Sequence, residues 1–168
     1  DLARIDPLTG VANRRAMGEA SDRMLAEAKG WRGSVGVLLL DADHFKHIND
    51  RFGHDGGDKV LQALVGYIQS MLRSGDIVGR VGGEEFLVLS PGVDEEGLMA
   101  LAERIRCTVE SSPLLINGES VRLTVSIGTA VAGPGGWDMT VLRRRADAAL
   151  YAARRAGGNR VMSGDARA

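Results

Sequence analysis

The sequence has little cysteine and no long apolar run. One cysteine among 168 residues excludes an internal disulfide framework and fits a reducing compartment. No apolar run approaches the ~20 residues that a membrane-spanning helix needs, and no signal-peptide pattern is present. We therefore expect a cytoplasmic chain without direct membrane contact from this segment, although a full-length parent with a membrane anchor fits the same sequence.

An excess of charge of either sign is also absent. The chain carries 21 lysines and arginines against 22 acids, which gives a formal net charge of -1. This balance provides no general attraction to nucleic acids or anionic membranes. We predict no nucleic-acid partner, and any site for an anion must be local.

Length and composition are those of one globular domain. A chain of 168 residues, 44% of them apolar, can build one sizeable core. We predict a single domain over residues 1–168, and because the chain starts at Asp1 without a methionine, we expect a fragment of a longer, regulated protein. Cys107 falls between Ile105 and Val109 on a helical pattern, which predicts a small buried hydrophobe.

Apolar periodicity and turn residues divide the chain into helices and strands. The predicted helices are 11–29 with Thr9 as a cap, 44–51, one from about 58 that is ended by Gly75, one capped by Asp94, and 140–156. The predicted strands are 34–41, 77–81, 86–89, 114–116, 121–131 and 159–162. The run 34–41 is almost continuously apolar, which is typical of a central strand covered on both faces.

Without the leading helix, the elements follow the order strand, helix, hairpin, helix, strand. This is the β-α-β-β-α-β plan of the ferredoxin-like class, an α+β fold whose central, mostly antiparallel sheet is flanked by helices, here with an extra hairpin strand at 114–118. In this plan the first and third strands are antiparallel neighbours. Asp41, at the end of the first, is therefore expected beside Glu84 and Glu85, at the start of the third.

Gly82 and Gly83 form the turn before these acids, because glycine adopts positive φ freely. The acids head an apolar strand, where burial of an unpaired charge is costly. Together with Asp41 and Asp43 they predict a cluster of three or four carboxylates. Oxygen ligands favour a hard cation, Mg²⁺ or Mn²⁺, and disfavour zinc. The alternative is an ordinary solvated turn.

Several motifs, in one order and over nearly the whole chain, resemble the GGDEF-type diguanylate cyclase domain. They are residues 6–10 with 13–15, 41–46 with 49–50, 52–54 with 57–58, 82–86, 126–128, and 146–147 with 151–152. The resemblance implies a fold of the nucleotidyl-cyclase type and condensation of two GTP molecules into cyclic di-GMP, with release of pyrophosphate. It also implies a homodimer in which each domain holds one GTP.

The resemblance assigns roles to the acids. Asp41, the Ala42 carbonyl and Glu84 would hold one or two Mg²⁺ ions on the triphosphate. Glu85 would assist the metal or the attacking 3′-hydroxyl. Asp41, Glu84 and Glu85 are therefore the candidate catalytic residues.

Nucleotide recognition is assigned in the same way. The positions of Asn49 and Asp58 read guanine, whose N1–H and amino group are donors for a side-chain oxygen, although Asp58 also fits a helix N-cap. Lys46 meets phosphate oxygens or is an ordinary exposed lysine. The remaining candidate substrate-binding residues are Phe45, Gly82, Gly83 and Arg154.

The phosphate-binding end departs from the family pattern. Arg154 stands where the family usually has lysine, and Gly158 stands where it usually has arginine. Arg154 can still carry positive charge to a phosphate, whereas Gly158 cannot. The affinity for GTP is the property that this departure puts in question. Arg155 or Arg160 could supply the positive charge that Gly158 lacks. The arginine run 143–145 is interpreted as a solvated helix face.

Arg73 and Asp76 lie at a fixed spacing before the hairpin and match the family's RxxD inhibitory site, which binds the product cyclic di-GMP. Arginine can fork onto a phosphate or a guanine edge, and aspartate can accept from guanine. The alternative is an arginine at a helix end and an aspartate in a turn. Arg104, on the following helix, is a candidate for the partner half of this site.

Two other functions remain open from the sequence. A non-catalytic domain could bind GTP or cyclic di-GMP and signal through protein contacts. Gly158 favours this alternative, and the intact acids disfavour it. A structural dimerisation module would leave the clustered carboxylates unexplained.

Overall fold

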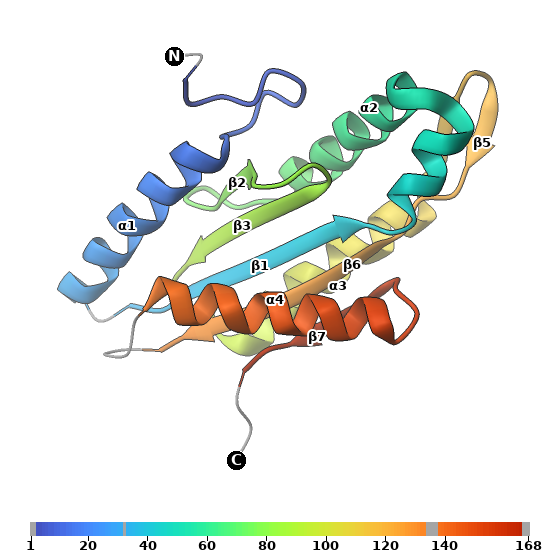
Figure 1. The fold of residues 1–168 in the computed structure, drawn as a ribbon. Helices are drawn as coiled ribbons and strands as arrows, with labels where there is room; N and C mark the ends of the chain where they lie inside the picture. The colour runs from blue at the N-terminus through green and yellow to red at the C-terminus, as the bar shows by residue number, and fades with distance from the viewer. Residues whose placement is uncertain (1–2, 32, 134–137, 166–168) are drawn as a thin grey trace.

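A five-stranded β-sheet forms the middle layer of the protein, with helices on both faces (Figure 1). The computed structural model describes residues 3–31, 33–133 and 138–165. The helices are α1 (Arg14–Trp31), α2 (Phe45–Met71), α3 (Glu95–Ser111) and α4 (Met139–Arg155). The strands are β1 (Val35–Ala42), β2 (Ile77–Arg80), β3 (Glu85–Pro91), β4 (Leu114–Ile116), β5 (Glu119–Val121), β6 (Val125–Ala132) and β7 (Arg160–Ser163).

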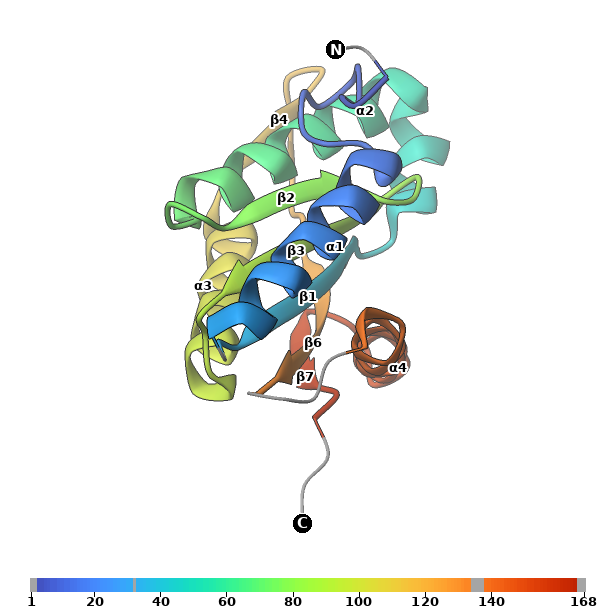
Figure 2. The ribbon, with the colours of Figure 1, turned by 90° about the vertical axis from the view of Figure 1, so that its left-hand side faces the viewer.

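Strand β1 lies at the centre of the sheet, whose strand order is β2-β3-β1-β6-β7. It pairs antiparallel with β3 and with β6, and β7 is parallel to β6 at the edge. Helices α2 and α3 cover one face and α1 and α4 the other, as the turned view shows (Figure 2). The predicted α+β fold with a mostly antiparallel central sheet is therefore confirmed, as is the edge strand predicted at 159–162.

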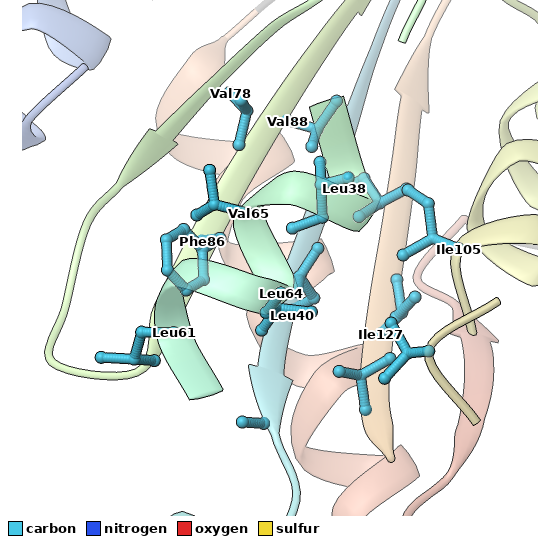
Figure 3. Close-up of a cluster of buried hydrophobic side chains, with 14 of the residues drawn as sticks. Leu38, Leu40, Leu61, Leu64, Val65, Val78, Phe86, Val88, Ile105 and Ile127 are labelled. Carbon is cyan, nitrogen blue, oxygen red and sulfur yellow. The ribbon is translucent and has the colours of Figure 1, made fainter. Parts of the chain in front are cut away.

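Every residue of β1 is buried, because successive side chains of a strand point to opposite faces and both faces are covered. Leu38 and Leu40 lie in the apolar layer under α2 and α3, together with Leu64 (Figure 3). Val37 and Leu39 lie in the second layer, under α1 and α4. The prediction of a central strand covered on both faces is confirmed.

Helix α4 packs directly on the backbone of β6 at Gly128. A Cβ at this position would lie 2.2 Å from the Ala146 carbonyl oxygen and 2.4 Å from the Leu150 amide nitrogen. Both are backbone atoms, which cannot give way unless the helix moves, so the close approach requires glycine. This contact sets the height of α4, and of the arginines that it carries, above the sheet.

Two details of the prediction are wrong, whereas the extra hairpin is confirmed. Strands β4 and β5 form this hairpin as a two-stranded sheet of their own, with Asn117 and Gly118 at positive φ in the turn. The strand predicted at 121–131 is interrupted at residues 122–124, so β5 and β6 are separate. Cys107 is exposed, because Ile105 and Val109 occupy the buried face of α3 and residues two apart on a helix point in different directions.

Helix boundaries also differ from the prediction. Helix α1 begins at Arg14 because Asn13 caps it: Oδ1 of Asn13 accepts a hydrogen bond from the Ala16 amide at 2.9 Å. Thr9 instead donates its hydroxyl within the preceding turn. The helices predicted at 44–51 and from 58 are two helical segments of α2 that meet at a kink, where Gly53 has φ 74° and ψ 178°; the second segment begins earlier than predicted. None of the described helices is long and apolar enough to cross a membrane.

Candidate active site

The antiparallel pairing of β1 with β3 places Asp41 directly opposite Glu85. Because β1 ends at Ala42 and β3 begins at Glu85, both acids lie at one end of the sheet. Arg80 holds the turn before Glu85, since its guanidinium donates two hydrogen bonds to the Gly83 carbonyl, at 3.0 and 2.7 Å. The register confirms that the acids expected to be neighbours are neighbours.

Asp41 is a buried carboxylate with one unsatisfied oxygen. Its Oδ2 accepts a hydrogen bond from Arg154 at 2.9 Å, whereas Oδ1 has no hydrogen-bond partner among the described residues. Burial raises the pKa of Asp41 to about 7; the negative charges of Glu85 and Glu84 add to this effect, and the positive charge of Arg154 opposes it. A carboxyl group in such surroundings has a strong tendency to take up a proton or a cation.

The two glutamates of the turn have different surroundings. Glu85 accepts a hydrogen bond from Arg143 at 3.1 Å, so α4 partly neutralises its charge. Glu84 is half-buried. In the part of the chain that the structure describes, no three acidic, histidine or cysteine side chains are arranged as a ready metal cage. The predicted acids therefore lie together, while Arg143 and Arg154 engage two of them.

Asp43 is held by hydrogen bonds of its own. Its oxygens accept from the Thr124 and Ser126 hydroxyls, at 2.8 and 2.6 Å, and from the Asn159 amide at 2.8 Å. Its carboxylate joins the end of β1 to β6 and to the turn after α4, and its negative charge adds to the effect of burial in raising the pKa of Asp41, as expected for a member of the carboxylate cluster. A Cβ on Gly158 would lie 3.0 Å from this carboxylate, and Gly158 has φ 75°, so a larger residue there would be strained unless the backbone changed.

The residues assigned to the nucleotide base lie on α2. Oδ1 of Asn49 is buried without a hydrogen-bond partner within the described ranges, and a Cβ on Gly57 would lie 1.8 Å from it. An unpaired acceptor of this kind is available to a donor on a ligand. Asp58 lies inside α2, beyond the kink, so its alternative role as a helix N-cap is wrong. Lys46 is exposed, whereas Phe45 is buried in the core.

Arg73 and Asp76 form an ordered network after the end of α2. The buried Asp76 carboxylate accepts from the Arg73 amide and from the Ser90 hydroxyl, both at 2.8 Å. The Arg73 guanidinium also donates to Ser90 and to the Pro91 carbonyl, at 2.9 and 3.1 Å. Asp76 thus stabilises the turn, as the structural alternative expected, while Arg73 remains accessible. Arg104 is exposed on α3.

Two residues that shape the site were not predicted from the sequence. Arg143, interpreted as part of a solvated helix face, is half-buried and bonded to Glu85. Arg80 holds the turn and is itself bonded to Asp6 at 3.2 Å. These pairs join residues far apart in sequence, so their spacing carries no signal.

Residues 3–160 match the family model described as diguanylate cyclase, GGDEF domain. The chain belongs to the GGDEF-domain family. Diguanylate cyclase DgcP of Pseudomonas aeruginosa is 42% identical over 160 residues, which are 95% of this chain and 24% of DgcP. The response regulator PleD of Caulobacter vibrioides is 39% identical over 164 residues, which are 96% of this chain and 36% of PleD. This GGDEF domain therefore spans between a quarter and just over a third of those relatives.

Solved GGDEF domains share its fold. The GGDEF domain of DgcB from Caulobacter crescentus, in complex with c-di-GMP, matches with a TM-score of 0.92 and 36% identity, covering 98% of this chain and 94% of that one. The active GGEEF domain of a diguanylate cyclase from Vibrio cholerae matches with a TM-score of 0.86 and 35% identity, covering 94% and 99%. The motif GGEEF, by which the Vibrio domain is described, is also the sequence of residues 82–86 in this GGDEF domain.

Asp41 should make the stability of this GGDEF domain depend on pH. In the folded state Asp41 keeps its proton up to a pH near 7, whereas the unfolded chain releases it near the ordinary value of 3.8. Between these values the folded state binds more protons, so the contribution of Asp41 to the free energy of unfolding falls as the pH rises. We expect Asp41→Asn, in urea denaturation without divalent cations, to raise the free energy of unfolding by roughly 2 kcal/mol at pH 8 and by little at pH 4.

Asp50→Asn is the matched control, because Asp50 is an exposed aspartate on α2. This substitution should leave the pH dependence of the parent unchanged. If Asp41→Asn also left it unchanged, the raised pKa of Asp41 would be disproved.

Proposed function

We propose that the domain is a diguanylate cyclase, which condenses two GTP molecules into cyclic di-GMP and releases pyrophosphate. The observation that supports this most directly is the Asp41 carboxylate, buried with an unpartnered Oδ1 and placed beside Glu85 within the described structure. Membership of the GGDEF family agrees with the proposal. The activity of the whole protein to which this domain belongs is part of the same proposal.

The donor set suits a hard divalent cation, Mg²⁺ or Mn²⁺. Asp41, the Ala42 carbonyl, Glu84 and Glu85 are the residues that would hold it. The Oδ1 atom of Asp41, buried without a partner among the described residues, fits this role because a cation would satisfy it and lower the pKa of the carboxyl group. When bound, the cation neutralises charge on the triphosphate as the phosphoryl group transfers.

In the proposed reaction the 3′-hydroxyl of one GTP attacks the α-phosphorus of the other. A bond forms between the 3′-oxygen and the α-phosphorus, the bond from the α-phosphorus to the oxygen that bridges to the β-phosphate breaks, and pyrophosphate leaves. The same step with the roles of the two nucleotides exchanged closes the ring and releases a second pyrophosphate. Glu85 accepts the hydroxyl proton. Arg154, whose side chain is 56% exposed, can turn from Asp41 to the phosphate oxygens. The exposed Gly82 and Gly83 leave the turn backbone open to the nucleotide.

Recognition of guanine is proposed for two residues of α2. The carboxylate of Asp58 and the Oδ1 of Asn49, which has no hydrogen-bond partner among the described residues, are acceptors for the N1–H and the amino group of the base. Lys46, exposed near the start of α2, supplies a positive charge for the phosphates. Phe45, assigned to the nucleotide by resemblance, lies in the core, and we now propose that it supports the start of α2 from below.

We further propose that two copies of the domain act together in the cytoplasm, where GTP is available. Cyclic di-GMP consists of two equivalent halves, and its formation needs two GTP molecules facing each other. Each copy supplies one set of acids at the end of its sheet, so a two-fold symmetric pair supplies two. The homodimer is therefore the smallest assembly that completes the product.

Product formation tests the proposal. The domain, fused to a dimerising coiled coil and incubated with GTP and Mg²⁺, should produce cyclic di-GMP that mass spectrometry identifies. Glu85→Ala should lower the rate by about 100-fold or more, because a general base contributes roughly this factor or above. Glu96→Ala is the matched control, since Glu96 is an exposed glutamate on α3.

The second candidate function is a non-catalytic receptor for GTP or cyclic di-GMP. Gly158 and the bond between Arg154 and Asp41 favour it, because both weaken the hold on a triphosphate. GTP that binds the fusion in calorimetry and yet stays intact would decide for the receptor. A fusion that bound neither nucleotide would contradict both functions.

We also propose that Arg73 contacts cyclic di-GMP outside the active site, together with Asp76 and with Arg104 of a facing copy. The Arg73 side chain is 55% exposed, although Asp76 and Ser90 hold it in place. Because Nε and Nη2 already donate to Asp76, Ser90 and Pro91, the Nη1 group is the one that can donate its two hydrogens to a phosphate or to a guanine edge. The buried Asp76 acts mainly by holding Arg73.

Arg73→Lys tests this product site, because it keeps a positive charge beside Asp76 and removes the fork. We expect cyclic di-GMP to bind roughly tenfold more weakly in calorimetry. Arg15→Lys is the control, since Arg15 is exposed on α1. If Arg73→Lys bound cyclic di-GMP as tightly as the parent, Arg73 would not be part of the product site.

A further inference from the structure

A pocket lies between α1 and α4, beside the candidate active site. The two helices cover the same face of the sheet (Figure 1). Strand β3 contributes Leu87 to the pocket between them. Its apolar lining consists of Met17, Val81, Leu87 and Met139, and its volume is about 560 Å³. This size and lining are typical of sites for small molecules. None of the functions proposed above uses the pocket.

The polar lining of the pocket favours an anion. Arg14, Arg143 and Arg144 carry three positive charges, and Asp22 and Asp147 carry two negative charges, so the lining has a net charge of +1. Arginine groups bind carboxylate, sulfonate and phosphate groups through paired hydrogen bonds. The apolar lining adds room for a flat hydrocarbon body.

Arg143 contacts the candidate active site and also lines the pocket, and it has a hydrogen-bond donor that is not used by any described residue. Its guanidinium donates to Glu85 at 3.1 Å. Its Nε atom is buried without a hydrogen-bond partner in the described ranges, and Asp147 Oδ2, at 3.9 Å, is too distant for a hydrogen bond. A buried donor without a partner is costly, so an additional acceptor stabilises this side chain.

We propose that the pocket binds a small organic anion with a flat apolar body, and that this anion competes with Glu85 for Arg143. The apolar body lies on Met17 and Leu87, and the anionic group takes hydrogen bonds from Arg143. Because one guanidinium serves both acceptors, occupation of the pocket weakens the ion pair with Glu85. The pocket is thus a second ligand site coupled to the end of the sheet.

Gly18 offers a way to close the pocket. It lines the cavity from α1, and a Cβ at this position would meet no atom within 4 Å. Alanine therefore fits without a clash and favours the helix by about 1 kcal/mol. Phenylalanine at the same position projects a ring into the open space and blocks the ligand.

Fluorescence titration with 8-anilinonaphthalene-1-sulfonate tests the site, because this probe combines a flat apolar body with one anionic group. Gly18→Phe should abolish saturable binding, whereas Gly18→Ala should bind like the parent. Arg143→Met should weaken binding about tenfold, which corresponds to one hydrogen bond to a charged group. Arg145→Met, an exposed position of α4 outside the pocket, is the matched control.

Glu85→Gln tests the competition. Because it removes the charge that holds Arg143, it should tighten binding of the probe about threefold or more. Circular dichroism and thermal melts establish that each variant is folded. Binding that persisted in Gly18→Phe and in Arg143→Met would overturn the site, and unchanged affinity in Glu85→Gln would overturn the competition. No measurement here requires GTP turnover, so the outcome is independent of the proposed cyclase activity.

Discussion

The pairing of β1 with β3 places the carboxylates of Asp41 and Glu85 opposite each other at one end of the sheet. Strand β1 is covered on both faces, so Asp41 cannot escape to solvent, and its side chain is 5% exposed. Two adjacent acids in such a place repel each other and lose hydration. The lost hydration and this repulsion raise the pKa of Asp41, and positive charge from the surrounding structure partly offsets them.

Helix α4 supplies that charge in the described structure. Its backbone lies against β6 at Gly128, and from this position Arg154 reaches Asp41 and Arg143 reaches Glu85. In the proposed enzyme a divalent cation would take over part of this compensation, and the phosphates of GTP would attract the arginines in place of the carboxylates. The arginines are then free to meet phosphate oxygens or, for Arg143, an anion in the pocket beside α1. A single helix thereby links the acids to two ligand sites.

Much of the fold and of the site could be predicted because local pattern and topology agree. The apolar run 34–41 predicted a buried central strand, and the order of elements then required that Asp41 lie beside Glu85. Tertiary contacts decided the rest. Asp43 was counted with the carboxylate cluster, but its hydrogen bonds with the hydroxyls of Thr124 and Ser126 could not be predicted, because those residues are distant in sequence.

The roles of Arg143 and Cys107 could not be predicted from spacing for a related reason. Arg143 belongs to a run of three arginines, and only the packing of α4 decides which of them turns toward the sheet. Cys107 lies two positions from each of two buried residues, where a helix has already rotated away from its apolar face. In both cases the rotation of a helix about its axis determines the environment of the side chain.

An NMR titration of the Asp41 carboxyl carbon, with and without Mg²⁺, tests the central claim that this buried carboxylate binds a divalent cation. Without divalent cations the resonance should titrate with a pKa of about 7, and saturating Mg²⁺ should shift this pKa to a lower value. Asp41→Asn should remove the resonance and weaken the binding of Mg²⁺. A pKa near the ordinary 3.8 without cations, or a pKa that Mg²⁺ leaves unchanged, would contradict the account.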